Sequence, residues 1–171
     1  KNLGDEMEIM IDCYLSWDIE FTTRVAERVR DFDVKWFEDP LQNGWATYVS
    51  RFHALDLDAQ NEFLKKQGYV RFADMLAHVV AWWEEGEKVI TGILANPDYR
   101  WEDYDIDAFN AQAIRRFDGL DEADVVNSFD LARLSFTALV VDLPEDAFGN
   151  KKILGWLNAD VIEHLQDHDI S

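Results

Sequence analysis

From residue 43 to the end of the chain, apolar residues recur at helical spacing and no stretch alternates like a strand. The pattern predicts helices at residues 43–55, 70–95, 107–118, 121–142 and 151–169. Gly68 separates the first two, with room for a further helical turn around 58–66. Pro97 ends the longest helix, because proline lacks an N–H donor and restricts the residue before it. We therefore expect a mainly α-helical fold.

The segment 98–106, between the second and third of these helices, is rich in acidic and aromatic residues and predicts a long crossover connection. Asp107 or a neighbour is expected to cap the next helix, and Asp121 and Asp124 lie where acidic residues favour a helix N-terminus. Four principal helices with one long connection predict a four-helix bundle. The apolar stripe of the fourth predicted helix is expected to include Leu131, Leu134, Leu139 and Val140.

The first 42 residues have a different pattern. Residues 7–12 alternate and then run apolar like a half-buried strand, residues 18–29 have helical spacing, and residues 34–37 form a second short apolar run before a proline. The expected order is strand, helix, strand. The chain is therefore expected to have two parts, an appendage at 1–42 and a helical domain at 43–171.

Charge and cysteine content limit the partners of such a chain. It holds 35 acidic residues against 16 Lys and Arg, a formal charge of -19, which argues against nucleic acid and against an anionic membrane as partners. Its one cysteine, Cys13, excludes an internal disulfide and a cysteine-rich zinc site and fits a reducing compartment. No apolar run reaches the length of a membrane span. We therefore expect a cytoplasmic protein.

Two of the four histidines, His164 and His168, are one helical turn apart near the end of the chain. An i,i+4 pair presents both imidazoles on one helix face, where they can chelate a metal ion. His78, on the apolar face of the longest helix, is the natural third ligand, since an unpaired imidazole is costly to bury. Imidazole ligands favour Zn²⁺ or Ni²⁺, with Fe²⁺, Mn²⁺ or Co²⁺ as alternatives.

Each histidine also has an ordinary structural explanation. A pair near a C-terminus can be a solvated helix end, where imidazolium stabilises the negative end of the helix dipole. His78 alone can be a core residue with a satisfied hydrogen bond. His53 has no partner at helical spacing and is expected to be a surface or packing residue.

Three segments of the helical part carry a resemblance to a known family. They are residues 72–86 (FADMLAHVVAWWEEG), 107–110 (DAFN) and 161–168 (VIEHLQDH). With these segments, residues 43–171 resemble the DinB-like superfamily of metal-binding four-helix bundles. In that family, a histidine on the second helix joins a His-x3-His pair on the last helix to bind a divalent metal.

By this resemblance, the metal ligands are His78, His164 and His168. Some DinB-like proteins are thiol-dependent transferases or isomerases, some are hydrolases, and many have no assigned activity. The resemblance implies a small-molecule substrate and a metal that acts as a Lewis acid or lowers the pKa of bound water or thiol. It names no catalytic residue.

Other residues near the ligands in sequence are candidates for supporting roles. The acidic candidates for a base, or for a group that orients the ligands, are Glu84, Glu85, Glu163 and Asp167. The aromatic candidates for a pocket wall are Trp82, Trp83 and Trp156. A solvated acidic helix face explains the first set more simply, and a packed core explains the second.

Residues 10–17 (MIDCYLSW) and 36–41 (WFEDPL) resemble a βαβ piece of the enolase-superfamily barrel, in its mandelate-racemase and sugar-acid-dehydratase branch. There, acids that end two successive strands bind magnesium, and the matching residues here are Asp12 and Glu38. The third acidic ligand, the lysine bases and the His–Asp pair are missing, and two strands cannot close an eight-stranded barrel. We therefore expect a remnant without dehydratase activity, whose two acids are plain exposed carboxylates.

The leading hypothesis is a divalent-metal-binding protein that acts on a small molecule, as a thiol-dependent transferase or a metal-dependent hydrolase. The alternative is a non-catalytic binding or dimerising module, with structural histidines and a homodimer formed through residues 1–42. The sequence names neither the substrate nor the metal.

Overall fold

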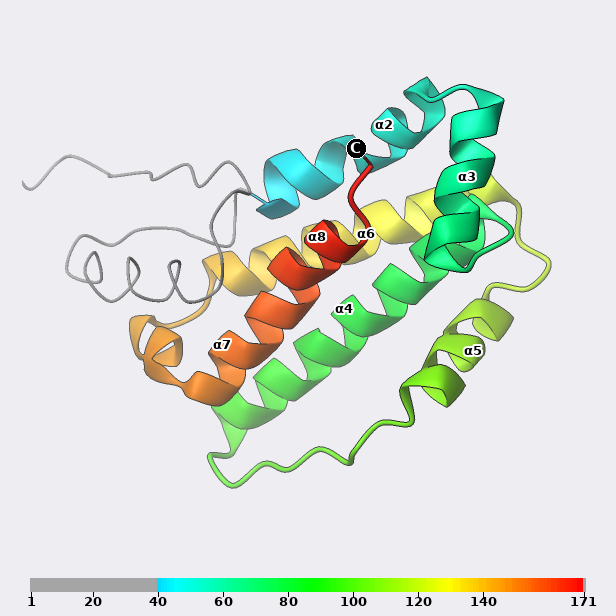
Figure 1. Ribbon diagram of the computed structural model, residues 1–171. Helices are drawn as coiled ribbons and strands as arrows, with labels where there is room; N and C mark the ends of the chain where they lie inside the picture. The colour runs from blue at the N-terminus through cyan, green and yellow to red at the C-terminus, as the bar shows by residue number, and fades with distance from the viewer. Residues whose placement is uncertain (1–39, 171) are drawn as a thin grey trace, which may run out of the picture.

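The computed structural model describes residues 40–170 (Figure 1). The predicted strand–helix–strand elements, with Asp12, Cys13 and Glu38, lie outside the described residues. The described chain is mainly helical and contains no strand. Its α-helices are α2 (Tyr48–Ala54), α3 (Leu57–Gln67), α4 (Phe72–Ala95), α5 (Ile106–Arg116), α6 (Glu122–Val141), α7 (Lys151–Leu157) and α8 (His164–Asp167).

Short helical turns of other types join or extend these helices. They are the π-helical turns η2 (Pro40–Gly44) and η5 (Asn158–Glu163) and the 3₁₀ turns η3 (Trp45–Thr47) and η4 (Glu145–Gly149). Among the described helices, none combines the length and the apolar character that crossing a membrane requires.

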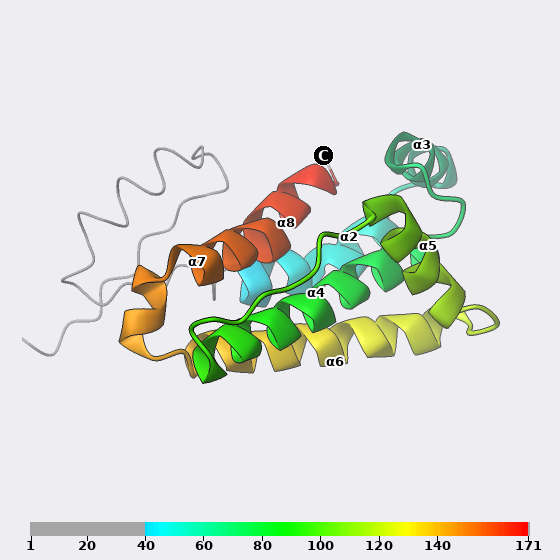
Figure 2. The same cartoon turned by 90° about the horizontal axis from the view of Figure 1, so that it is seen from below.

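The long helix α4 lies at the centre of the structure (Figures 1 and 2). It packs along α6 on one side and against α5, α7 and η5 on others. The first turns, η2 and η3, contact α6, and η2 also contacts η5. The connection from α4 to α5 runs back along α4, as expected for a long crossover (Figure 2). This arrangement leaves the α7–η5–α8 segment facing α4.

Local sequence signals explain where several helices begin and end. The carboxylates of Asp56, Asp105 and Asp121 cap α3, α5 and α6, each by accepting a hydrogen bond from the backbone N–H three residues later. The cap of α5 is thus a neighbour of Asp107. At the end of α3, Gly68 has φ +80°, a left-handed conformation that glycine adopts without strain.

Aromatic rings form the centre of the core and also hold η5 in place. The ring of Trp83 lies 5.2 Å from that of Trp45 and 5.1 Å from that of Phe129. The Trp45 indole donates a hydrogen bond to the Val161 carbonyl at 3.2 Å, and the Trp83 indole donates to the Asp160 carbonyl at 2.9 Å. The last part of the chain is thereby fixed against α4.

The buried stripe of α6 differs from the predicted one. Its buried residues are Val125, Phe129, Phe136 and Val140. Leu131 and Leu134, predicted for the core, are 61% and 54% exposed. At about 100° per residue, both point roughly 150° away from the centre of the buried stripe. Val140 is buried and Leu139 is partly buried, so only this part of the predicted stripe was right.

The helix predicted for residues 151–169 is interrupted. It comprises α7, the π-helical turn η5 and the short α8, which ends at Asp167. A π-helical turn holds more residues than an α-helical turn and therefore changes which side chains share a face. Such turns are frequent at functional sites. Here the turn lies directly before His164.

Candidate metal centre

The three histidines predicted as ligands lie together. His78 comes from the N-terminal third of α4, His164 begins α8, and His168 follows α8 as its C-cap. One ligand nitrogen from each lies within 4.8 Å of the other two. His78 and His168 are buried, and His164 is partly buried. The predicted convergence is confirmed, and the cluster could hold a metal ion.

A fixed hydrogen-bond partner determines which nitrogen of His78 is free. Its Nδ1 lies 3.0 Å from Asn110 Oδ1, which also accepts a hydrogen bond from the Trp82 indole at 2.9 Å. Because an indole N–H can only donate, the amide must present its oxygen here. His78 Nδ1 is therefore the donor, and its Nε2 keeps the lone pair that a metal needs.

The same logic holds for His168. Its Nδ1 lies 2.9 Å from Gln67 Oε1, and the amide nitrogen of Gln67 donates to the Asp167 carbonyl at 2.9 Å. The carbonyl can only accept, so the Gln67 oxygen must face the ring. The Tyr48 hydroxyl further anchors this end of the chain by donating to the His168 carbonyl at 2.6 Å. His168 Nε2 is thus also left with a free lone pair.

His164 completes the cluster without such a partner. Its ring centre lies 5.1 Å from that of His78 and 5.7 Å from that of His168. Its Nδ1 is buried and makes no hydrogen bond of ordinary geometry with the described residues. A buried polar atom without a partner is unusual in a folded protein. The ring is therefore held mainly by packing, and the Asp160 carbonyl is the polar group that acts on it.

The three imidazoles are neutral at neutral pH. Burial, helped by repulsion from His168, lowers the pKa of His78 to about 4. Burial and repulsion from the other two histidines lower the pKa of His164 to about 3, against the opposing effect of the Asp160 carbonyl. Burial also lowers the pKa of His168. Neutral imidazoles can bind a metal ion without first losing a proton.

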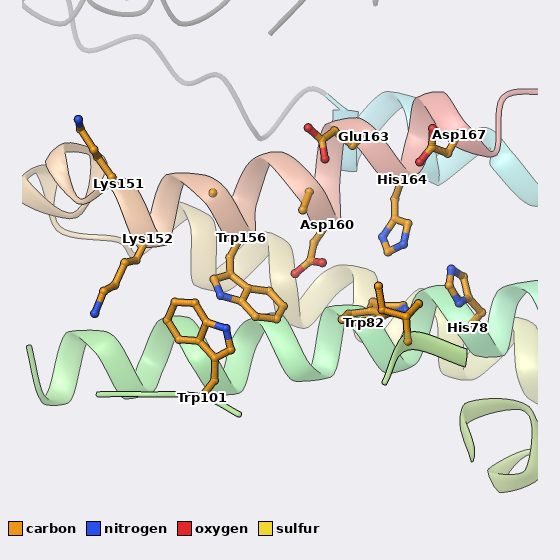
Figure 3. Close-up of a pocket in the computed structure, with 13 residues that line it drawn as sticks. His78, Trp82, Trp101, Lys151, Lys152, Trp156, Asp160, Glu163, His164 and Asp167 are labelled. Carbon is orange, nitrogen blue, oxygen red and sulfur yellow. The ribbon is translucent and has the colours of Figure 1, made fainter. Parts of the chain in front are cut away.

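A cavity of about 620 Å³ opens beside the cluster (Figure 3). Its lining includes His78 and His164 at one end and Lys151 and Lys152 at the other. Its volume is within the range usual for small-molecule sites. The cluster therefore borders a space that could admit a substrate.

Asp160 lines this cavity from η5, and sequence analysis did not single it out. Its side chain points towards α4 (Figure 3), and the residue is 1% exposed. Oδ2 is buried and has no hydrogen-bond partner among residues 40–170. Burial, with a smaller contribution from Glu85, raises the pKa of this carboxyl well above its usual value. A side chain at Gly86 would overlap Oδ2, so the glycine makes the space that the carboxyl occupies.

The four acidic candidates differ in whether they line the cavity. Glu163 and Asp167 line the cavity, and Glu163 accepts a hydrogen bond from Asn158 at 2.7 Å. Glu84 is exposed, pairs with Arg116 and does not line this cavity. Glu85 is tied to the Tyr104 hydroxyl and to Lys88, both at 2.7 Å. Only the first two acids remain candidates for a base.

The aromatic candidates are likewise divided between the cavity wall and the core. Trp82 and Trp156 line the cavity, together with Trp101, which sequence analysis did not single out. Trp83 is fully buried and belongs to the core. His53 is exposed and pairs with Glu122 at 3.1 Å, as expected for a surface residue.

Sequence signals for the missed residues were weak. Asp160 precedes His164 by one helical turn, and Gly86 follows Trp82 by one turn on α4, so both could have been placed on ligand-bearing helices. Asn110 belongs to a segment noted for its resemblance, without a role. Gln67 reaches His168 across 101 residues, and no local pattern points to that contact.

Compared with known proteins, the chain matches no family model, and no solved structure matches it. A stretch of 41 residues is 34% identical to L-rhamnonate dehydratase of Saccharopolyspora erythraea. The stretch makes up 24% of this chain and 10% of that enzyme, so the chain spans about a tenth of the relative's length. A match this short does not place the chain in a family. The resemblances stated for residues 43–171 and 1–42 stay predictions.

Proposed function

We propose that residues 43–171 form a DinB-like four-helix bundle that binds a divalent metal ion, Zn²⁺ or Ni²⁺ first, through His78, His164 and His168. The observation that carries this proposal is the cluster of three neutral imidazoles within 4.8 Å, at the edge of a cavity of about 620 Å³. The donor set suits the ion, because Nδ1 of two rings is engaged by side-chain amides and Nε2 is free. Three protein ligands also leave a position for water or substrate.

The proposed activity is transfer or hydrolysis on a small molecule, either thiol-dependent or with water as nucleophile. A bound divalent ion supplies Lewis acidity and lowers the pKa of a bound water or thiol. The protein's own groups orient the imidazoles, through Asn110 and Gln67, and shield the site with indole rings. Glu163 or Asp167, at the rim of the cavity, is the proposed proton acceptor.

Metal analysis of the full chain, purified without a polyhistidine tag, tests the binding. We expect about one ion per chain after supplementation with Zn²⁺ or Ni²⁺, as for a three-histidine site. His164→Ala and His168→Ala should lose the ion, whereas His53→Ala, on the surface, should retain it. Absence of stoichiometric metal in the wild-type chain would contradict the proposal.

Activity is tested by comparing two reactions before and after chelation. Hydrolysis of nitrophenyl esters measures attack by water, and conjugation of an aromatic electrophile with added glutathione measures thiol transfer. A rate that is lost on chelation and restored by the ion supports the corresponding reaction. If neither reaction depends on the metal, the catalytic part of the proposal fails while metal binding can still stand.

A second candidate function is a non-catalytic dimerising module. It is favoured by Leu131 and Leu134 of α6, both of which are more than half exposed. Light scattering should then give the mass of two chains, and replacement of both leucines by glutamate should give the mass of one. A monomeric wild-type chain would exclude this candidate.

A further inference from the structure

We propose that the half of the cavity away from the histidines binds a flat aromatic molecule that carries a carboxylate and a hydroxyl group. This inference deepens the proposed function. It rests on that function only for the expectation that the reacting part of the molecule lies beside the histidines. Three features of the cavity carry it: indole walls, a buried carboxyl group with one oxygen unpaired among the described residues, and a pair of lysines at the far end.

The walls suit a flat apolar body. The ring of Trp156 lies 5.9 Å from that of Trp101, at a steep angle of 81°, and 6.4 Å from that of Trp82. All three rings are partly exposed and line the cavity. Indole faces stack on aromatic rings more favourably than on polar groups. The space beside them therefore favours an aromatic ligand.

The wall that bears Trp101 belongs to the crossover between α4 and α5, and two contacts hold this segment in place. The Tyr104 hydroxyl donates to Glu85 on α4 at 2.7 Å, and Lys152 Nζ lies 5.8 Å from the centre of the Trp101 ring. The Tyr104 ring also lies 5.9 Å from that of Trp156. The indole walls thus come from three elements that pack on one another.

Asp160 supplies the polar group within this apolar space. This residue is 1% exposed, and its Oδ2 lacks a hydrogen-bond partner among residues 40–170 although the side chain lines the cavity. Native proteins rarely leave such an atom unpaired. A ligand hydroxyl can both donate and accept, so it can pair with this group whether the carboxyl is protonated or ionised. The unpaired oxygen therefore indicates a hydroxyl on the ligand.

Lys151 and Lys152 are the cationic residues of the cavity lining, at the end opposite to His164 (Figure 3). Neither forms an ion pair within the part of the chain that the structure describes. On a chain with a formal charge of -19, two adjacent lysines without a carboxylate partner among residues 40–170 form a local site for an anion. A carboxylate at this end would place the hydroxyl towards Asp160.

The test uses three naphthalene probes and calorimetry on the full chain after removal of metal by a chelator. Hydroxynaphthoate carries the hydroxyl and the carboxylate at opposite ends of the rings, naphthoate lacks the hydroxyl, and naphthol lacks the carboxylate. We expect the hydroxynaphthoate to bind tightest, and loss of the hydroxyl to weaken binding about 3- to 10-fold, the value of one hydrogen bond.

Variants assign each preference to its residue. Asp160→Ala should bind hydroxynaphthoate and naphthoate alike, and Lys151→Gln with Lys152→Gln should bind hydroxynaphthoate and naphthol alike. The matched control is Lys65→Gln with Lys66→Gln, an adjacent pair on the exposed face of α3, which should keep both preferences. The lysine variant removes no fully buried group, since Lys151 is exposed and Lys152 is half-buried, so it remains informative if Asp160→Ala does not fold.

The inference is overturned if the wild-type chain binds none of the probes, or if the lysine variant keeps the wild-type preference for the carboxylate. It is also overturned if folded Asp160→Ala keeps the preference for the hydroxyl. The probe titration uses metal-free protein and is therefore independent of the metal analysis. Probe binding by a chain that takes up no stoichiometric metal would contradict the proposed function alone. Metal binding without probe binding would defeat this inference alone.

Discussion

Two polar groups lie between α4 and the η5–α8 segment, and they are built differently. In the histidine cluster, Nδ1 of His78 and of His168 is engaged by a side-chain amide whose orientation is set by a second hydrogen bond. One turn earlier, the Asp160 carboxyl is at least as buried, yet its Oδ2 has no partner among the described residues.

The two groups therefore lack different binding partners. The amides leave a free lone pair on His78 Nε2 and on His168 Nε2. The histidine cluster therefore lacks only a cation. Oδ2 of the carboxyl lacks a hydrogen-bonding group, which no side chain of residues 40–170 supplies. The protein also keeps Gly86 opposite the carboxyl, where a side chain would overlap it. Experiments can therefore challenge each side separately.

The largest effect is expected from removing the ligand on α4. His78→Ala leaves only the i,i+4 pair His164 and His168 to hold the ion. It should lower the affinity for Zn²⁺ by more than the roughly 10- to 100-fold lost when a hydrogen bond that supports a ligand is removed. Competition with a chromogenic chelator measures the affinity, with His53→Ala as control. Unchanged affinity in His78→Ala would show that the triad is not a single site.

Acid should destabilise the metal-free protein through the histidine side. The folded pKa of His78 is about 4, below the ordinary value of 6.5, so the unfolded chain binds the proton more tightly. The stability is therefore present above pH 6.5 and is lost as pH falls towards 4, by about 3 kcal/mol for this group.

Urea denaturation of the chelated protein at several pH values between 6.5 and 4 measures this loss, with the range set by the pKa of His78. His78→Gln cannot take up the proton, so its free energy of unfolding should fall less steeply than that of the wild type. Parallel curves for the two proteins would mean that His78 is not held neutral by burial.

The amide partners should have a smaller effect on metal affinity. Asn110→Ala and Gln67→Ala each free a ring that was fixed, and we expect a loss of about 10- to 100-fold in affinity for Zn²⁺. Asn158→Ala is the matched control, because its amide bonds Glu163 and no histidine. If all three variants bind the ion equally, the amides do not orient the ligands.

The smallest effect is expected on the carboxyl side. Gly86→Ala places a methyl group against Asp160 Oδ2 and should destabilise the fold by about 1–3 kcal/mol, as overpacking does. In Gly155→Ala the new methyl meets no atom within 4 Å, and this helical position should gain about 0.5–1 kcal/mol.

Thermal denaturation compares these glycine variants with the double variant Gly86→Ala with Asp160→Ala. The second substitution removes the overlapping carboxyl, so the double variant should be more stable than additivity predicts. Strict additivity would indicate that Gly86 is required for a reason other than the carboxyl.

Much of the helical part could be predicted because its signals are local. Apolar spacing, aspartate caps and Gly68 act within a few residues, and the observed helices begin and end near the predicted positions. The spacing of His164 and His168 likewise determines that they share a helical face. Leu131 and Leu134 were misplaced because α6 carries apolar residues on several faces, and only its packing partners determine which face is buried.

The rest depends on contacts between distant parts of the chain. Gln67 is hydrogen-bonded to His168 across 101 residues, and Asn110 to His78 across 32 residues. Only these contacts determine which ring nitrogen of each histidine is free. Asp160 lies one helical turn before His164, but only the packing of η5 on α4 buries its carboxyl and leaves Oδ2 without a partner among residues 40–170.

By itself, the sequence determined the mainly helical character of the described part of the chain and three histidines able to act as ligands, because periodicity, caps and spacing are properties of neighbouring residues. Only the tertiary structure decided that the three rings converge, which ring nitrogens of His78 and His168 are free, and that a carboxyl oxygen beside them has no partner among residues 40–170. Burial and long-range hydrogen bonds arise from packing, which no single helix contains.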